Sequence, residues 1–211
     1  LAKALIKKDL YDPATIHFAA DGMLEASQKG PVFEPKFIFY KTDKWKNIDK
    51  ESKNAFEFFI KKFKKNIEVF DVPGYFKDIP KHHQIIHETD LANNFQAYYK
   101  KDKKKLSKEM RDAIERGLKH SAYDYANAID FMDQSYQSYK EVFEDYHGVI
   151  TPSANGVADK GLKSTGSADF QKIWTYMGLP TISLPLLTGE SNLPLGVQLI
   201  GDKLDDIRFL S

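Results

Sequence analysis

The segment from Val149 to Gly201 constrains the fold more than any other, because it has the highest density of Gly and Pro, few charges and the clearest strand patterns. Gly148–Pro152 predicts a short buried strand, which ends because proline has no N–H to donate to a neighbouring strand. Glycines in the stretch 154–167 predict a long loop. Apolar residues at helical spacing in Asp169–Met177 predict a helix, and Gly178 suits a left-handed cap at its end.

Two further runs in this segment alternate with a period of two. Leu179–Pro185 and Leu193–Gly201 have this pattern, and the turn residues Gly189–Asn192 lie between them. The combination predicts an antiparallel hairpin. We expect the active surface of the protein to border this segment.

The region 36–73 predicts a strand, a helix and a second strand. Aromatic and branched residues mark strands over 36–41 and 67–73. Between them, Asp49 is a suitable N-cap for a helix whose apolar stripe comes from Ala55, Phe56, Phe59, Ile60 and Phe63. A strand–helix–strand unit of this length predicts parallel pairing of its two strands.

The region 76–146 predicts helices. A capping box at Ser121 and Asp124 predicts the start of one that continues to Tyr146. Near the N-terminus, residues 1–10 are helix-like, whereas 21–35 are rich in turn residues and predict a surface connection.

Composition excludes several classes of protein. The 211 residues are 42% hydrophobic and carry 31 basic against 30 acidic residues, a net charge of +1, so the overall charge gives no field for nucleic acid or an anionic membrane. The chain has no cysteine, which excludes disulfides and thiolate zinc sites. It has no apolar run of about 18 residues, so the sequence predicts no membrane-spanning helix.

The order of motifs after residue 148 is specific. It runs through Thr151-Pro152-Ser153, Thr165-Gly166, Phe170, Trp174-Thr175, Gly178-Leu179-Pro180, Leu184-Pro185, the sequence LPLGVQLIG over 193–201, and Asp205-Asp206. This order resembles the C-terminal part of the amidase signature enzymes, and a looser similarity extends upstream around 121–125. The resemblance implies an α/β fold, in which residues 1–211 form the C-terminal portion of a single domain built on a large, twisted, mixed sheet flanked by helices. In that portion, 36–73 is strand–helix–strand, 76–146 is helical and 147–211 supplies sheet and pocket.

The resemblance implies hydrolysis of a carboxylic amide through an acyl-serine intermediate. The family's nucleophilic serine, the second serine in a cis peptide and the lysine all belong to its N-terminal half, and no matching Gly/Ser-rich segment occurs here. No catalytic residue can therefore be assigned to this chain, and we expect it to be inactive by itself. The implied partners are a small-molecule amide and the N-terminal half of the same enzyme, with a homodimer left open. We expect a cytoplasmic protein with no cofactor, metal, nucleic acid or membrane.

Candidate substrate-binding residues follow from the same resemblance. They are Tyr136, Thr151, Ser153, Thr165, Phe170, Trp174 and Thr175. Trp174 fits a pocket wall and a core position equally well. Neither Thr151 nor Ser153 has a base near it in sequence, so lining the end of the sheet is favoured over a nucleophilic role. The chain also departs from the family at Ala158-Asp159 and at 166–168, which leaves the rim of the loop uncertain.

Two polar clusters have simpler interpretations. His83 and His87 share a helical face, but Gln84 stands where a zincin has its catalytic glutamate, so a solvated helix surface is favoured over a metal site. The run Lys100–Lys105 is favoured as a solvated segment over an anion-binding patch.

Two other functions stay open from the sequence. The first is a glutamine-dependent amidotransferase subunit; in such relatives an arginine holds the substrate carboxylate, and its position falls near Tyr136 here, which argues against an amino-acid amide. The second is a non-catalytic binding or scaffold relative. Apolar stripes and a sheet edge left uncovered argue against it, because such surfaces aggregate or recruit partners.

Overall fold

The computed structural model describes residues 4, 6–12, 15, 22–31, 33–161, 164–189 and 192–211. The chain consists of two compact units, each with more contacts within itself than with the other. The sheet unit comprises Leu1–Asp71, Glu141–Phe170 and Gly178–Ser211, and the helical unit comprises Val72–Lys140 and Gln171–Met177. Across the described ranges, every helix is too short or too polar to cross a bilayer.

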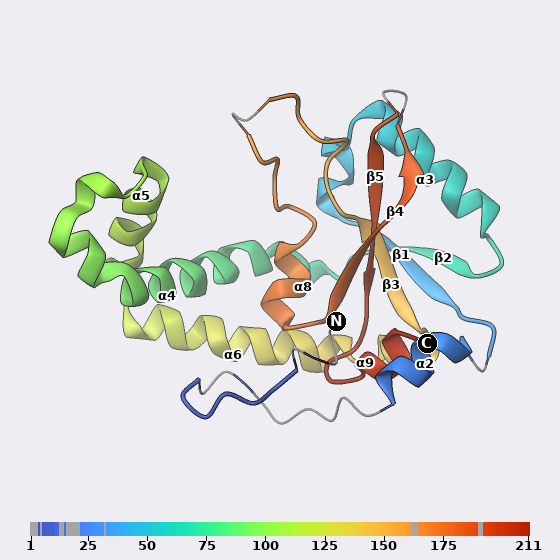
Figure 1. The fold of residues 1–211 in the computed structure, drawn as a ribbon, viewed down its shortest axis with the longest axis horizontal. Helices are drawn as coiled ribbons and strands as arrows, with labels where there is room; N and C mark the ends of the chain where they lie inside the picture. Colours follow the sequence, from blue (N-terminus) through green and yellow to red (C-terminus); the bar gives the residue numbers. More distant parts are fainter. Residues whose placement is uncertain are drawn as a thin grey trace. The chain divides into compact units, whose positions relative to one another are not determined.

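A five-stranded mixed sheet forms the centre of the sheet unit (Figure 1). Its spatial order is β2-β1-β3-β5-β4, with parallel pairing among the first three strands and antiparallel pairing from β3 to β4. The strands are β1 Phe37–Lys41, β2 Ile67–Asp71, β3 Gly148–Pro152, β4 Thr181–Thr188 and β5 Pro194–Ile200. This confirms the α/β class, the parallel pair and the hairpin. The helices of the unit are α2 Met23–Lys29, α3 Lys50–Lys62, α7 Val142–Asp145 and α9 Asp206–Phe209, with a 3₁₀ turn η1 at Asp43–Asn47.

The core of the sheet unit lies where α3 packs on the sheet. Phe39 of β1 is fully buried and meets Trp45 edge to face, with ring centroids 5.4 Å apart, and Phe56 of α3 at 5.9 Å. Helix α3 begins as predicted, because the Asp49 carboxylate accepts the Ser52 N–H at 2.7 Å. Burial of these aromatic rings fixes the helix on the strands.

The helical unit contains α4 Ile79–Asp102, α5 Lys108–Gly117, α6 Ala122–Tyr139 and α8 Lys172–Met177, with 3₁₀ turns η2 Gly74–Lys77 and η3 Lys103–Lys105. Its aromatic cluster is centred on Trp174, which is fully buried and packs on Phe76 and Tyr139 at centroid distances of 6.0 and 5.9 Å. The Tyr176 hydroxyl donates to the Ala128 carbonyl at 2.5 Å, which ties α8 to α6. The predicted helix of residues 169–177 is therefore confirmed over its last six residues.

Three local predictions need correction or lie outside the described residues. Region 21–35 contains α2, bounded by Gly22 and Gly30 in positive-φ conformations that glycine allows. The helix predicted to reach Tyr146 ends at Tyr139, and a separate turn, α7, follows. Of the predicted helix at 1–10, residues 6–9 are irregular and most others lie outside the described residues, as do 190 and 191 of the predicted turn.

A buried carboxylate joins α4 to α5. Glu88 is 3% exposed, and it accepts hydrogen bonds from Gln84 Nε2 at 2.9 Å and Arg116 Nε at 2.7 Å and pairs with His120 Nε2 at 3.1 Å. Burial alone raises the pKa of Glu88, but the bonds from Gln84, Arg116 and His120 outweigh it and hold the pKa below its usual value.

We expect Glu88→Gln to destabilise the helical unit by about 1–2 kcal/mol at neutral pH, because one charged partner of a buried pair is lost while Arg116 stays partly solvated. A lowered folded-state pKa contributes stability above the unfolded-state value, and that contribution is lost as pH falls through the folded-state value. The gap between wild type and variant in urea unfolding should therefore close on acidification. Asp130→Asn, at an exposed position of α6, is the control. A gap that is constant from neutral to acid pH would contradict the assignment.

Candidate functional site

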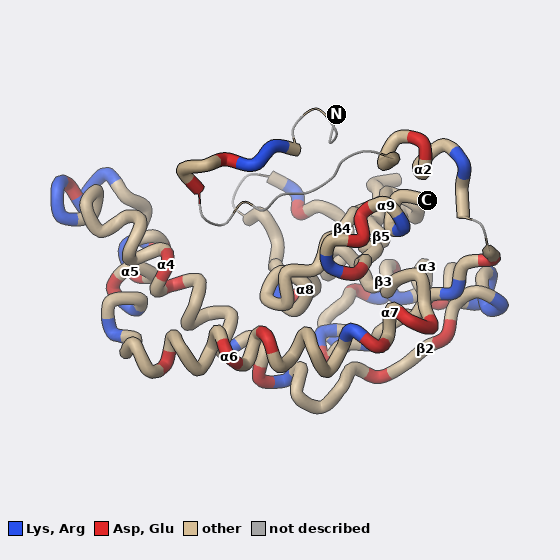
Figure 2. Tube along the Cα trace, turned by 90° about the horizontal axis from the view of Figure 1, so that it is seen from below, with Lys and Arg blue, Asp and Glu red and all other residues tan. Residues whose placement is uncertain are grey.

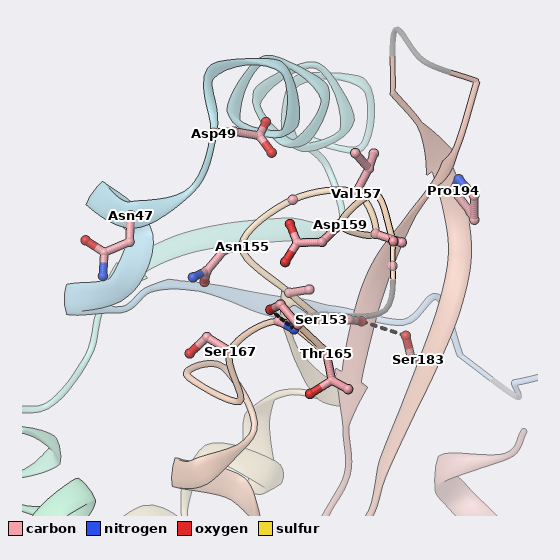
Figure 3. Close-up of a pocket in the computed structure, with 17 residues that line it drawn as sticks. Asn47, Asp49, Ser153, Asn155, Val157, Asp159, Thr165, Ser167, Ser183 and Pro194 are labelled. Atoms are coloured by element: carbon pink, nitrogen blue, oxygen red, sulfur yellow. Dashed lines mark hydrogen bonds between the residues drawn. The ribbon is translucent and has the colours of Figure 1, made fainter.

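A polar pocket of about 1000 Å³ lies at the carboxyl end of β3 in the sheet unit (Figure 3). The carboxyl ends of parallel strands are the usual place for ligands in α/β sheets. The loop that follows β3 forms most of the wall, η1 and the start of α3 form another side, and β4 and β5 close it. The lining residues are Asn47, Asp49, Ser153, Ala154, Asn155, Gly156, Val157, Ala158, Asp159, Gly161, Ser164, Thr165, Gly166, Ser167, Ser183, Pro194 and Gly196.

The start of α3 anchors the loop after β3. The Asp49 backbone N–H donates to the Asn155 carbonyl at 3.0 Å, while the Asp49 side chain caps α3. At Gly156 a Cβ would lie 1.9 Å from Asp49 Oδ2, so a larger residue there would displace the carboxylate that caps α3. Asp49 therefore begins the helix through its carboxylate and anchors the loop that forms the pocket wall through its backbone N–H.

Two serine hydroxyls meet at the base of the pocket. Ser153 follows β3 and Ser183 belongs to β4, and their Oγ atoms lie 2.7 Å apart, joined by the dashed line in Figure 3. Strand β5 runs between them, and the pair passes over Gly196, where a Cβ would lie 2.7 Å from Ser153 Oγ and 2.8 Å from Ser183 Oγ. The absence of a side chain at Gly196 makes this contact across three strands feasible.

A buried polar row lies next to the pair. Thr151 and Gln198 are cross-strand partners in β3 and β5, and Gln198 is also paired with Ser183 of β4. Thr151 is 0% and Gln198 3% exposed, and neither Thr151 Oγ1 nor the Gln198 amide has a hydrogen-bond partner among the described residues. A sheet interior normally has apolar side chains there, because unpaired buried polar atoms are costly. These unpaired buried polar groups indicate that this end of the sheet has a role other than packing.

The family model for amidases matches residues 2–210. The chain belongs to the amidase family. This result agrees with the order of motifs after residue 148, and it extends the similarity over nearly the whole chain.

Three similar proteins illustrate the relationship. A glutamyl-tRNA(Gln) amidotransferase subunit of Alkaliphilus metalliredigens (strain QYMF) is 30% identical over 117 residues, which are 50% of this chain and 24% of that protein. A solved complex described as vestigial, which bears on the origins of an s-triazine catabolic enzyme, has a TM-score of 0.81 at 15% identity and covers 99% of this chain and 48% of its own. A bacterial aryl acylamidase of the amidase signature family has a TM-score of 0.69 at 14% identity, covering 96% of this chain and 46% of its own.

This amidase-family chain therefore spans about half the length of these solved relatives, and the half of it that aligns with the amidotransferase subunit covers about a quarter of that protein. The structural similarity at such identities establishes the shared fold. It agrees with the mixed sheet and helices described above.

The predicted substrate-binding residues of this amidase-family chain fall into three groups. Ser153 and Thr165 line the pocket. Thr151 is buried in β3, and Phe170 is 1% exposed in the core cluster with Phe39 and Trp45. The remaining three belong to the helical unit, where Tyr136 is half-buried, Trp174 is fully buried and Thr175 is exposed.

Sequence reasoning missed several pocket residues. Ser183 lies in a run whose alternation was recognised, and its position on the polar side of that strand was the available signal. Others come from η1 and the loop, where no periodic pattern marks a side chain; they are Asn47, Asn155, Asp159 and Ser167.

The histidines of α4 belong to the helical unit. His82 stacks on Phe131 with centroids 4.4 Å apart, and His83 stacks on His87 at 5.8 Å. Burial lowers the pKa of His82 and of His83, with further lowering from Lys81 and His87 respectively. Within the described ranges, no three His, Cys, Asp or Glu side chains gather as metal ligands. The lysines at the end of α4 and in η3 are exposed; Figure 2 draws lysine and arginine positions in blue along the backbone.

Proposed function

We propose that this chain is the C-terminal portion of an enzyme that hydrolyses a carboxylic amide, and that its nucleophilic serine lies outside these 211 residues. The observation that carries the proposal is the amidase-family match along residues 2–210. The polar pocket supports it, because its hydroxyl and amide groups suit hydrogen bonding to an amide and its acyl substituent.

The proposed chemistry proceeds in two steps. The serine oxygen attacks the amide carbon, the C–N bond breaks, and the amine leaves with a proton, which gives an acyl-serine ester. Water then attacks that ester, the C–O bond to serine breaks, and the carboxylic acid is released. In this scheme Ser153, Thr165 and Ser183 hold the substrate, and the substrate-binding roles of Tyr136, Thr151, Phe170, Trp174 and Thr175 remain proposals.

An uncovered apolar surface supports the need for the remaining half. β4 is an edge strand, Leu186 on it is 56% exposed, and Phe63, the C-cap residue of α3, is 42% exposed. Both border an apolar groove of about 390 Å³ beneath the hairpin. An exposed edge beside apolar side chains favours pairing with a further segment. We propose that the N-terminal half of the enzyme covers it.

The test compares the 211-residue chain with the full product of its native gene on a panel of amides. We expect no turnover by the chain alone, and turnover by the full product with hydroxamate formation when hydroxylamine replaces water as acyl acceptor. Turnover by the chain alone, or hydrolysis by the full product without any hydroxamate, would refute the proposal. An inactive full product of this same length would favour the scaffold alternative.

Ser183→Ala tests the pocket in the full enzyme. We expect KM to rise about tenfold with a smaller change in kcat, because a hydroxyl that binds the substrate is lost. Gly196→Ala, whose Cβ would collide with both serine hydroxyls, should have at least as large an effect. Ser138→Ala, at an exposed site on α6, is the control. Unchanged KM in both pocket variants would place substrate elsewhere.

A glutamine-dependent amidotransferase subunit is the second candidate. The observation that favours it is the 30% identity to the Alkaliphilus amidotransferase subunit. Tyr136, where an arginine would hold the glutamine carboxylate, argues against it. Release of ammonia from glutamine by the full enzyme, in preference to other amides, would favour this second function.

A further inference from the structure

A second cavity, of about 410 Å³, lies wholly within the helical unit. It is formed by α4, α5 and the start of α6, and its lining residues are Lys81, Gln84, Ile85, Glu88, Arg116, Lys119, His120 and Asp124. Three of these eight are permanently cationic, a fourth is histidine, and two are acidic. The proposed amidase chemistry makes no use of this cavity.

Both acidic groups are already engaged by neighbouring residues. The buried Glu88 carboxylate binds Arg116 through Nε and lies 3.1 Å from His120 Nε2. The Asp124 carboxylate accepts the Ser121 N–H at 3.1 Å and the Ser121 hydroxyl at 2.7 Å in the capping box of α6. The positive groups that line the cavity are therefore only partly neutralised.

Glu88 also fixes the orientation of the arginine. Arg116 uses Nε for this ion pair, its side chain is 51% exposed, and its two terminal amino groups have no partner among the described residues. At Gly117 a Cβ would lie 1.9 Å from the Glu88 carbonyl oxygen, so α5 lies directly against α4 at this point. The fork of the guanidinium is thus held in place before any ligand arrives, which reduces the entropic cost of binding.

We propose that this cavity binds a phosphate group, as the free ion or as a phosphate monoester. The terminal amino groups of Arg116 match a pair of phosphate oxygens, and Lys81 and Lys119 supply two further charges at the rim. A dianion satisfies this set of cations better than a single carboxylate does. The cavity exceeds the size of one phosphate, and Ile85 provides an apolar wall for a carrier group.

The experiment is calorimetric titration of the 211-residue protein with inorganic phosphate and with AMP, with acetate at matched ionic strength as the monoanion. We expect saturable phosphate binding, with a dissociation constant on the order of millimolar, and weaker binding of acetate. Lys81→Gln and Lys119→Gln should each weaken phosphate binding several-fold without changing Tm, and Arg116→Gln should weaken it about tenfold. Lys101→Gln, at an exposed position of α4 in the same unit, is the matched charge control.

Because Arg116→Gln also removes a partner of Glu88, the two lysine variants decide the result. Unsaturable binding, equal binding of acetate, or lysine variants that bind as tightly as the Lys101→Gln control would each overturn the proposal. Tighter binding of AMP than of phosphate would support the site and assign it to a monoester, whereas equal or weaker AMP binding would support it and assign the free ion.

Discussion

Gly117→Ala is expected to destabilise the helical unit by about 3 kcal/mol, the upper end of the range for overpacking a close contact. The new Cβ would lie 1.9 Å from the carbonyl oxygen and 2.5 Å from the carbonyl carbon of Glu88. Both are backbone atoms, so no side-chain rotation relieves the clash and α5 must move away from α4. That movement also pulls Arg116 away from the Glu88 carboxylate.

This expectation has the opposite sign to the usual effect of the substitution. Glycine to alanine at a compatible site stabilises a protein by about 0.4–1 kcal/mol, chiefly through the unfolded chain. Gly74→Ala in the same unit is the matched control, because its Cβ would meet no atom within 4 Å. Urea unfolding followed by far-UV circular dichroism measures both variants. A Gly117→Ala protein as stable as the Gly74→Ala protein would show that the two helices are not in close contact.

Trp174→Ala is expected to lower the stability of the helical unit by about 3–5 kcal/mol, as removal of a large buried aromatic side chain does. The indole is fully buried between Phe76 and Tyr139. Loss of this ring leaves a cavity in the aromatic cluster. In calorimetry, the helical unit of the variant should therefore unfold at a lower temperature than that of the wild type.

Thr175→Ala separates packing from binding at the neighbouring position. Thr175 is exposed on the same helix, α8, so its truncation should leave Tm within about 1 °C of wild type, as for most surface substitutions. If Thr175 contacts the substrate, KM of the full enzyme rises in this variant.

For the Trp174→Ala variant, a Tm equal to that of the wild type would contradict the core position of the indole.

Local patterns were sufficient to predict most elements. Strands β1 and β2 follow from their aromatic and branched residues, β3 from a short run that ends at a proline, and the β4–β5 hairpin from alternation on both sides of a turn. The caps at Asp49 and Ser121 were also predictable, because the capping contacts join residues three apart. Helix α2 was missed, since its seven residues between two glycines give too short a pattern to distinguish from a turn-rich loop.

The side chains of the candidate site come together from positions that are far apart in the sequence. Ser153 and Ser183 are 30 residues apart in the sequence, and β5 lies between their strands. Their hydroxyls can meet because the residue of β5 that lies between them, Gly196, has no side chain. Their contact depends on strand order and register, neither of which a local pattern specifies. The sequence could nominate Ser153 but gave no reason to connect it with Ser183.

By itself the sequence determined the fold class, the approximate positions of the strands and the family, because residue type, alternation, helical spacing and an ordered set of motifs are all properties of neighbours along the chain. Only the tertiary structure decided that Trp174 packs in the core of the helical unit, and that Glu88 holds Arg116 and His120, which lie 28 and 32 residues further along the chain. The physical reason is that burial and pairing of charges depend on which helices cross and where they touch. In this chain the crossing of α4 and α5 is set by the space left at Gly117.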